Sequence, residues 1–199
     1  MSRKKMFIAG FMLMFLLLVG STMAYLTDMD SKTNVFTFGN VDVEISEPHW
    51  VPADGLNIIP GQTLPKDPKV TNTGSTNAYV FMKTSIPCVN NKPVFTFTLN
   101  SGWTVMWDAD STICQGDTAY GVFAYGTSTT MTPLAPNAST PTLFDSVTVA
   151  SLNNSEVDQL PDELEITVIT EAVQADGDNT GHGHSSDPIE VSYALHPVA

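Results

Sequence analysis

The residues whose types and spacing best suit chemistry lie in one polar stretch, residues 176–187. Oxygen donors stand at positions 1, 3 and 5 of this stretch, glycine at position 6 and a carboxylate at position 12, as in a calcium-binding loop. The match is partial, because position 12 is Asp where a bidentate Glu is expected, and position 8 is glycine. The donors in order are Asp176, Asp178, Thr180 and Asp187.

Two histidines in the same stretch allow a second interpretation. His182 and His184, with Asp176 or Asp178, offer the imidazole and carboxylate ligands that transition metals accept. The third interpretation is an ordinary polar loop that binds nothing, and we favour it. We therefore predict no metal site and no cofactor, with calcium as the alternative.

Known enzyme motifs are absent from the sequence. None of the histidines stands in a zinc-protease pattern of two His four residues apart with an intervening Glu, and no Gly-x-Ser-x-Gly nucleophile turn occurs. The chain carries 21 acidic residues, and that many carboxylates on a solvated surface form close pairs by chance. We predict no catalytic residues and no enzymatic activity.

Three alternating residues, Trp103, Val105 and Trp107, would face one way in an extended strand. A row of this kind could stack on sugar rings, which would make the protein a glycan-binding module. Aromatic side chains also contribute much of the buried area in a β-sandwich, so the row is more typical of a core.

The only two cysteines are Cys88 and Cys114. An exported protein can keep such a pair oxidised, so we predict a disulfide between them, with two buried free thiols as the alternative. No histidine lies near either cysteine in the sequence, and neither resembles an activated thiolate.

The first 24 residues have the layout of an export signal. A basic patch at residues 3–5 precedes an apolar run at residues 6–19, and a small-x-Ala signal ends at Ala24. The run is shorter than the ~20 residues that a membrane-spanning helix needs. We therefore predict cleavage by a signal peptidase between Ala24 and Tyr25, with retention as an N-terminal anchor as the alternative.

The charge of the chain limits its partners. The formal net charge is −13, and loss of the three basic residues in the leader would make it −16. Nucleic acids and anionic membranes are bound by clusters of Lys and Arg, which the remaining five lysines do not provide. We expect a secreted or cell-surface protein that binds neither nucleic acid nor, after cleavage, a membrane.

Beyond the leader, period-2 alternation between turn residues predicts an all-β fold. The remaining 175 residues, 25–199, fit a single two-sheet β-sandwich of the jelly-roll or immunoglobulin-like kind. Residues 126–141 and 176–188 are expected to be surface loops, and the change of apolar parity at Gly39-Asn40 predicts a kink there. The expected strands are 36–38, 41–45, 69–72, 78–86, 94–99, 103–107, 119–125, 143–149, 164–174 and 189–195.

Several segments in order resemble the TasA and camelysin family of exported proteins, which use a dedicated signal peptidase. They are the junction AYLTD at residues 24–28, NVFTFGNV at 34–41, PKDP at 65–68, VTNTG at 70–74, AYV at 78–80, PTLFDSV at 141–147 and EAVQADG at 171–177. The resemblance runs from the leader to about residue 177.

The resemblance implies a jelly-roll-like β-sandwich that assembles outside the cell into matrix fibres or pilus-like filaments. Family members do so by donor-strand exchange, in which an N-terminal strand of one subunit completes the sheet of the next. In this chain the donor would be residues 25–38, and the alternative is that they form the first edge strand of a monomer. The interface residues implied are Tyr25, Leu26, Val35, Phe36 and Phe38.

The camelysin name also implies a cell-surface metallopeptidase. No zinc-binding pattern can be matched residue by residue in this sequence, so this activity is not carried over. The expected function is a structural fibre subunit that forms homo-oligomers; a metallopeptidase and a glycan-binding surface module are the alternatives.

Overall fold

The computed structural model describes residues 39–161, 163–175 and 185–195. All of them belong to one compact unit that begins at Gly39. The predicted leader, its cleavage site and the predicted donor segment lie outside the described residues. So do residues 176–184, which hold most of the candidate metal ligands.

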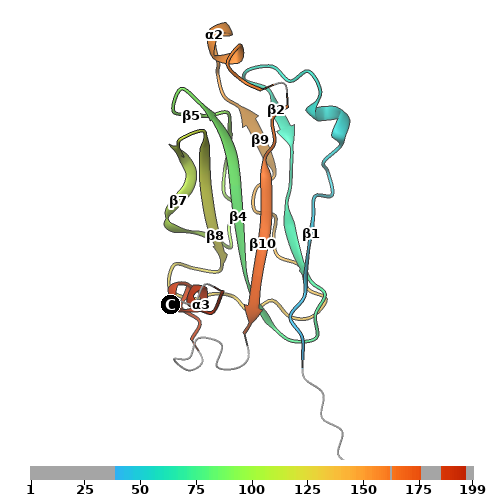
Figure 1. Cartoon of the computed structure of the whole chain (residues 1–199). Helices are drawn as coiled ribbons and strands as arrows, with labels where there is room; N and C mark the ends of the chain where they lie inside the picture. The colour runs from blue at the N-terminus through green and yellow to red at the C-terminus, as the bar shows by residue number, and fades with distance from the viewer. Residues whose placement is uncertain (1–38, 162, 176–184, 196–199) are drawn as a thin grey trace, which may run out of the picture. The chain divides into compact units, whose positions relative to one another are not determined.

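One layer of the fold is a sheet of antiparallel strands in the order β10-β4-β8-β7 (Figure 1). A short strand, β5, pairs with the end of β4. The strands are β4 (Ala78–Val89), β5 (Lys92–Pro93), β7 (Trp103–Gln115), β8 (Thr118–Tyr125) and β10 (Thr167–Gln174).

The second layer consists of two smaller antiparallel sheets, with strand orders β2-β9-β6 and β1-β3. Their strands are β1 (Val43–Ser46), β2 (Thr63–Pro65), β3 (Lys69–Asn72), β6 (Phe95–Phe97) and β9 (Ser146–Val149). Three short helical elements complete the described chain: η1 (Pro52–Gly55), α2 (Asn154–Val157) and α3 (Pro188–Leu195).

The main core lies between the two layers. Alternate residues of β4, including Val80 and Met82, are fully buried against residues of β9 such as Val147. Phe97 stacks on Phe144 with ring centroids 4.2 Å apart, an arrangement that adds to the area term for aromatic pairs. The predicted all-β sandwich is confirmed.

The predicted last strand, residues 189–195, is wrong. Ile189, Val191, Tyr193 and Leu195 alternate as in a strand, but the structure places them in α3. The reason lies in the two residues just before the alternation, because Asp187 and Pro188 form a helix start. The Asp187 carboxylate accepts a hydrogen bond from the Ile189 amide at 2.8 Å, and the Asp187 carbonyl accepts one from the Val191 amide at 2.9 Å.

The predicted surface loop at residues 126–141 is also wrong in part. Met131 and Leu134 in this loop are 1% and 3% exposed. Ala78 and Leu134 exchange both backbone hydrogen bonds, at 3.0 and 2.8 Å, so the loop is attached to the start of β4. The two apolar side chains anchor a segment whose composition is otherwise that of an exposed loop.

The chain enters the sandwich along a tight contact with the turn after β3. The Asn40 carbonyl accepts hydrogen bonds from the Ser75 amide at 3.0 Å and the Thr76 hydroxyl at 3.1 Å. A Cβ on Gly74 would lie 2.5 Å from this carbonyl, so glycine is required for the approach. The segment that leads into β1 thus lies at the end of the sandwich opposite α2 (Figure 1).

An unpaired strand beside an apolar groove

The candidate site is built on the segment that precedes β10. The sequence predicted one strand over 164–174, but only Thr167–Gln174 forms a ladder, with β4. The strand-like alternation continues before β10: Leu164 and Ile166 point inward and pack against the core, while Glu163 and Glu165 are exposed. Residues 163–166 form no ladder with any described residue. They are a strand by pattern without a partner.

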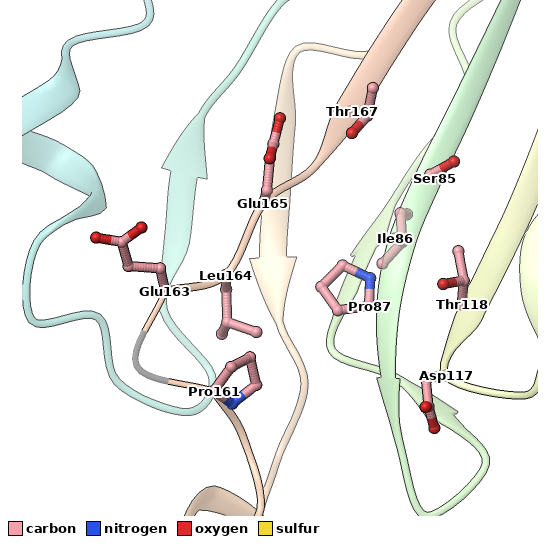
Figure 2. A pocket seen from close by; sticks show the side chains of 10 residues that line it. All are labelled: Ser85, Ile86, Pro87, Asp117, Thr118, Pro161, Glu163, Leu164, Glu165 and Thr167. Atoms are coloured by element: carbon pink, nitrogen blue, oxygen red, sulfur yellow. The ribbon is translucent and has the colours of Figure 1, made fainter.

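A hollow lies between this segment and the end of β4, the strand with which it would pair if the ladder continued. Its volume is about 210 Å³, and it separates the segment from the end of β4. Figure 2 shows Pro161 and Leu164 on one side and Ile86 and Pro87 of β4 on the other. The β10–β4 ladder ends at Thr167 opposite Ser85, so the two segments diverge beyond this point.

A larger groove, of about 1000 Å³ and lined by both polar and apolar residues, lies between the same segment and residues 55–60. Its lining includes buried core residues of the second layer, Val94, Val149 and Leu152. Two apolar side chains that line it are largely exposed, Leu56 at 70% and Val157 at 41%. Buried core residues thus form the floor of the groove, and exposed apolar side chains lie at its rim.

The groove continues into a hollow of about 340 Å³ that reaches Phe95 and Val147. Its lining also includes Trp50 and the largely buried Lys66. The Lys66 ammonium forms an ion pair with Glu47 at 2.7 Å and lies 5.3 Å from the centre of the Trp50 ring. These contacts hold the chain after β1 against the turn between β2 and β3.

A hydrogen-bonded pair, His49 and Asp67, reinforces the same attachment. Asp67 is buried and receives two hydrogen bonds from His49, one from the backbone amide at 2.9 Å and one involving Nδ1 of the ring at 2.7 Å. The paired carboxylate satisfies the requirement that a buried charge be hydrogen-bonded. The PKDP segment at residues 65–68 thus supplies both Lys66 and Asp67, which hold the chain after β1 in place.

Physically, the site suits an extended peptide. The unpaired backbone of residues 163–166 can pair with an added strand, and alternate side chains of that strand can enter the apolar groove. Among the described residues that line the groove, no nucleophile is paired with a base.

Comparison with known proteins gives one family. Residues 2–93 match the camelysin family. The family is described as camelysin metallo-endopeptidase, and the match confirms the resemblance predicted from the sequence over this range. It covers β1 to β5, including Trp50, Lys66 and Asp67. No curated protein matches the chain.

The metal that the camelysin name implies does not fit the described residues. Within them no three His, Cys, Asp or Glu side chains are grouped as metal ligands. His49 is the single histidine in the described ranges, and its Nδ1 lies 2.7 Å from Asp67. Of the predicted ligands only Asp187 is described, and it starts α3; Asp176, Asp178, Thr180, His182 and His184 lie outside the described residues.

The remaining predicted residues are placed as follows. Cys88 and Cys114 are joined by a disulfide, with Cα atoms 6.2 Å apart, between β4 and β7. Ala24, Tyr25, Leu26, Val35, Phe36 and Phe38 lie outside the described residues.

The predicted aromatic row does not form. Trp103 is buried and donates its indole hydrogen bond to the Pro141 carbonyl at 3.1 Å. Trp107 is 56% exposed and has φ +53°, because β7 loses its register with β8 between Val105 and Asp110. The two indoles therefore do not share a face: the favoured core placement holds for Trp103 and is wrong for Trp107.

Sequence reasoning missed the groove. The alternation at residues 164–168 was visible, but the lack of a neighbouring strand depends on where β4 and β8 turn. Exposed apolar residues in the loop before β2 were the available signal. None of the helices in the described ranges is long and apolar enough to cross a membrane.

Proposed function

We propose that this protein is an exported structural subunit that assembles into filaments by donating residues 25–38 to the groove of the next copy. The observation that carries the proposal is the unpaired segment 163–166 beside the groove. An added strand would complete the sheet edge and cover the exposed apolar side chains Leu56 and Val157. The leader at residues 1–24 supports export.

The chemistry of the predicted donor suits this groove. Val35, Phe36 and Phe38 are apolar anchors for a site lined by Val94, Val149 and Leu152. Residues 25–34 are polar and contain neither proline nor glycine, so their backbone can form a ladder throughout. Main-chain bonds would give affinity, and the anchors would set the register.

The placement of the two parts favours a filament. The chain enters the sandwich at the end opposite α2, whereas the groove is lined by Val157 of α2 (Figure 1). A donor that joins the sandwich at one end, with the acceptor groove at the other, would make a heterologous contact. Such contacts produce open filaments when the rotation between copies does not close a ring.

Insertion of the donor into the groove of its own chain is the rival arrangement. Fourteen extended residues span up to roughly 46 Å, so length alone allows it. The two arrangements differ in their dependence on concentration. Exchange between copies gives assemblies that grow with concentration, while insertion within one chain gives a monomer at every concentration.

The test is filament formation by the chain that begins at Tyr25, followed by electron microscopy and light scattering. We expect filaments, and we expect monomers when residues 25–34 are deleted. Leu164→Asp should block assembly, because it places a charge in the groove. Ile113→Asp is the matched control, since Ile113 is 65% exposed on β7. Filaments that survive the deletion would disprove the donor mechanism.

A camelysin-type peptidase is the second candidate, and the family match favours it. It predicts that the purified protein retains zinc and cleaves casein. Protein that holds no zinc and cleaves no casein, with or without added metal, would remove this candidate.

A further inference from the structure

The wall of the groove opposite residues 163–166 is formed by the connection between β1 and β2. We call residues 47–62 the strap. Its base is fixed by the pairs Glu47–Lys66 and His49–Asp67, and its far end by hydrogen bonds between Gly61 or Gln62 and Val149. Both ends of the strap are therefore attached to the second layer.

The middle of the strap is attached differently. Among the described residues, the hydrogen bonds made by residues 51–60 stay within the strap, for example from the Leu56 amide to the Ala53 carbonyl at 3.3 Å. Its support comes from packing: a Cβ on Gly55 would lie 3.1 Å from the Trp50 ring, which itself lies over Lys66. Ile58 packs against the core, so the part that can move without breaking a hydrogen bond to either layer is residues 51–57.

Two exposed apolar side chains lie at the groove mouth, across from the exposed Glu163 and Glu165. Leu56 in the middle of the strap lines both the groove and its inner continuation, and Val157 of α2 also lines the groove. Exposing large apolar side chains beside an apolar opening is unfavourable, and an occupant would remove them from water. Ile59 differs, because it is 63% exposed but does not line the groove.

We infer that the strap is a clamp: its middle closes over the peptide strand in the groove and buries Leu56 and Val157 against it. Lys66 is the positioning residue, since it holds the base through Glu47 and supports the middle through Trp50. The inference rests on the proposed function. It adds that the affinity for the peptide also depends on Leu56 and Val157, which form no backbone ladder with it. The occupant is residues 25–38 of a second copy.

The first experiment measures binding of a fluorescent peptide of residues 25–38 to the chain that begins at Gly39, which retains every described element. Leu56→Asn and Val157→Asn should each weaken binding about tenfold, the effect of losing one buried aliphatic side chain. Ile59→Asn on the same strap is the matched control and should stay within about twofold. Equal affinities for Leu56→Asn and Ile59→Asn would overturn the clamp.

The second experiment follows amide hydrogen exchange of the parent chain with and without the peptide. Closure predicts slower exchange at residues 51–58 as well as at 163–166. Protection at 163–166 alone would overturn the clamp and leave the proposed function intact, whereas a parent chain that binds no peptide would overturn both.

Lys66→Met should reduce the protection of residues 51–58 by the peptide, because it removes the contacts to Glu47 and Trp50. Lys83→Met is the matched control. The Lys83 ammonium pairs with the Glu171 carboxylate at a distance of 2.6 Å, and this pair does not line the groove. Protection of the strap that is the same in both variants would exclude Lys66 as its positioning residue.

Discussion

Ser111 shows how a single side chain sets the path of an edge strand. It has φ +65° and turns its hydroxyl inward to the buried Thr84 hydroxyl, 2.6 Å away, across Gly121 of β8. Left-handed backbone at a residue other than glycine is unfavourable and persists only where the surroundings impose it. The buried hydroxyl pair and the space left by Gly121 impose it here, and Trp107 and Asp108 are displaced outward in the same irregular stretch.

Gly121→Ala tests this arrangement. An alanine Cβ would overlap the hydroxyls of Ser111 and Thr84, so we expect a loss of about 1–3 kcal/mol in the free energy of unfolding, as for other overpacked sites. Urea denaturation measures the loss. Adding Ser111→Ala to this variant removes one overlapping hydroxyl and should recover part of it; full additivity of the two losses would contradict the explanation.

Glu156 gives a prediction about pH. A hydrogen bond from Lys92, at 2.8 Å, and one from the Asn153 amide lower the pKa of its carboxyl below the ordinary value of 4.5. A lowered folded-state pKa stabilises the fold above the unfolded pKa, and this contribution is lost as pH falls through the folded pKa.

We therefore expect the parent to be more stable than Glu156→Gln at pH 7, with the difference shrinking as pH falls below about 4.5. Thermal melts of both proteins between pH 7 and pH 3 measure it. The glutamine keeps the reciprocal bond to Asn153, so the comparison isolates the charge. A difference that does not depend on pH would contradict the assignment.

At the scale of elements, α3 shows that a helix start can outweigh the pattern that follows it. Asp187→Ala removes the acceptor of the Ile189 amide and should cost about 1 kcal/mol of stability, whereas Asp187→Asn should cost far less. Val191, 1% exposed, belongs to the small cluster with Tyr79 and Phe81, so fraying of α3 should speed amide exchange in this region. Unchanged exchange in Asp187→Ala would show that packing alone holds the helix.

The elements that could be predicted are those whose alternation meets a buried face. β3 was predicted with its observed bounds, and β4 and β8 nearly so, because apolar residues such as Val70, Met82 and Phe123 recur at their inward positions. The strands β2 and β5 are two or three residues long and leave too little pattern to detect. The alternation itself could not reveal the groove, because residues 163–166 have the sequence of a paired strand and lack only the partner among the described residues.

At the scale of the whole molecule, the separation of the chain entrance from the groove makes a strong prediction about growth. A copy without residues 25–38 keeps its groove and can accept a donor, but it has none to give. It should therefore end a filament at the position where it is incorporated.

We expect that adding this truncated chain to the chain that begins at Tyr25 shortens the filaments in proportion to the fraction added, as measured by electron microscopy. The matched control is a truncated chain that also carries Leu164→Asp, because it has no donor and its groove is blocked by the charge. It should leave filament length unchanged. If both truncated chains shorten filaments equally, assembly uses a surface other than the groove. If neither does, the contact between copies is not a transfer of residues 25–38, and the open edge beside residues 163–166 must be covered in another way.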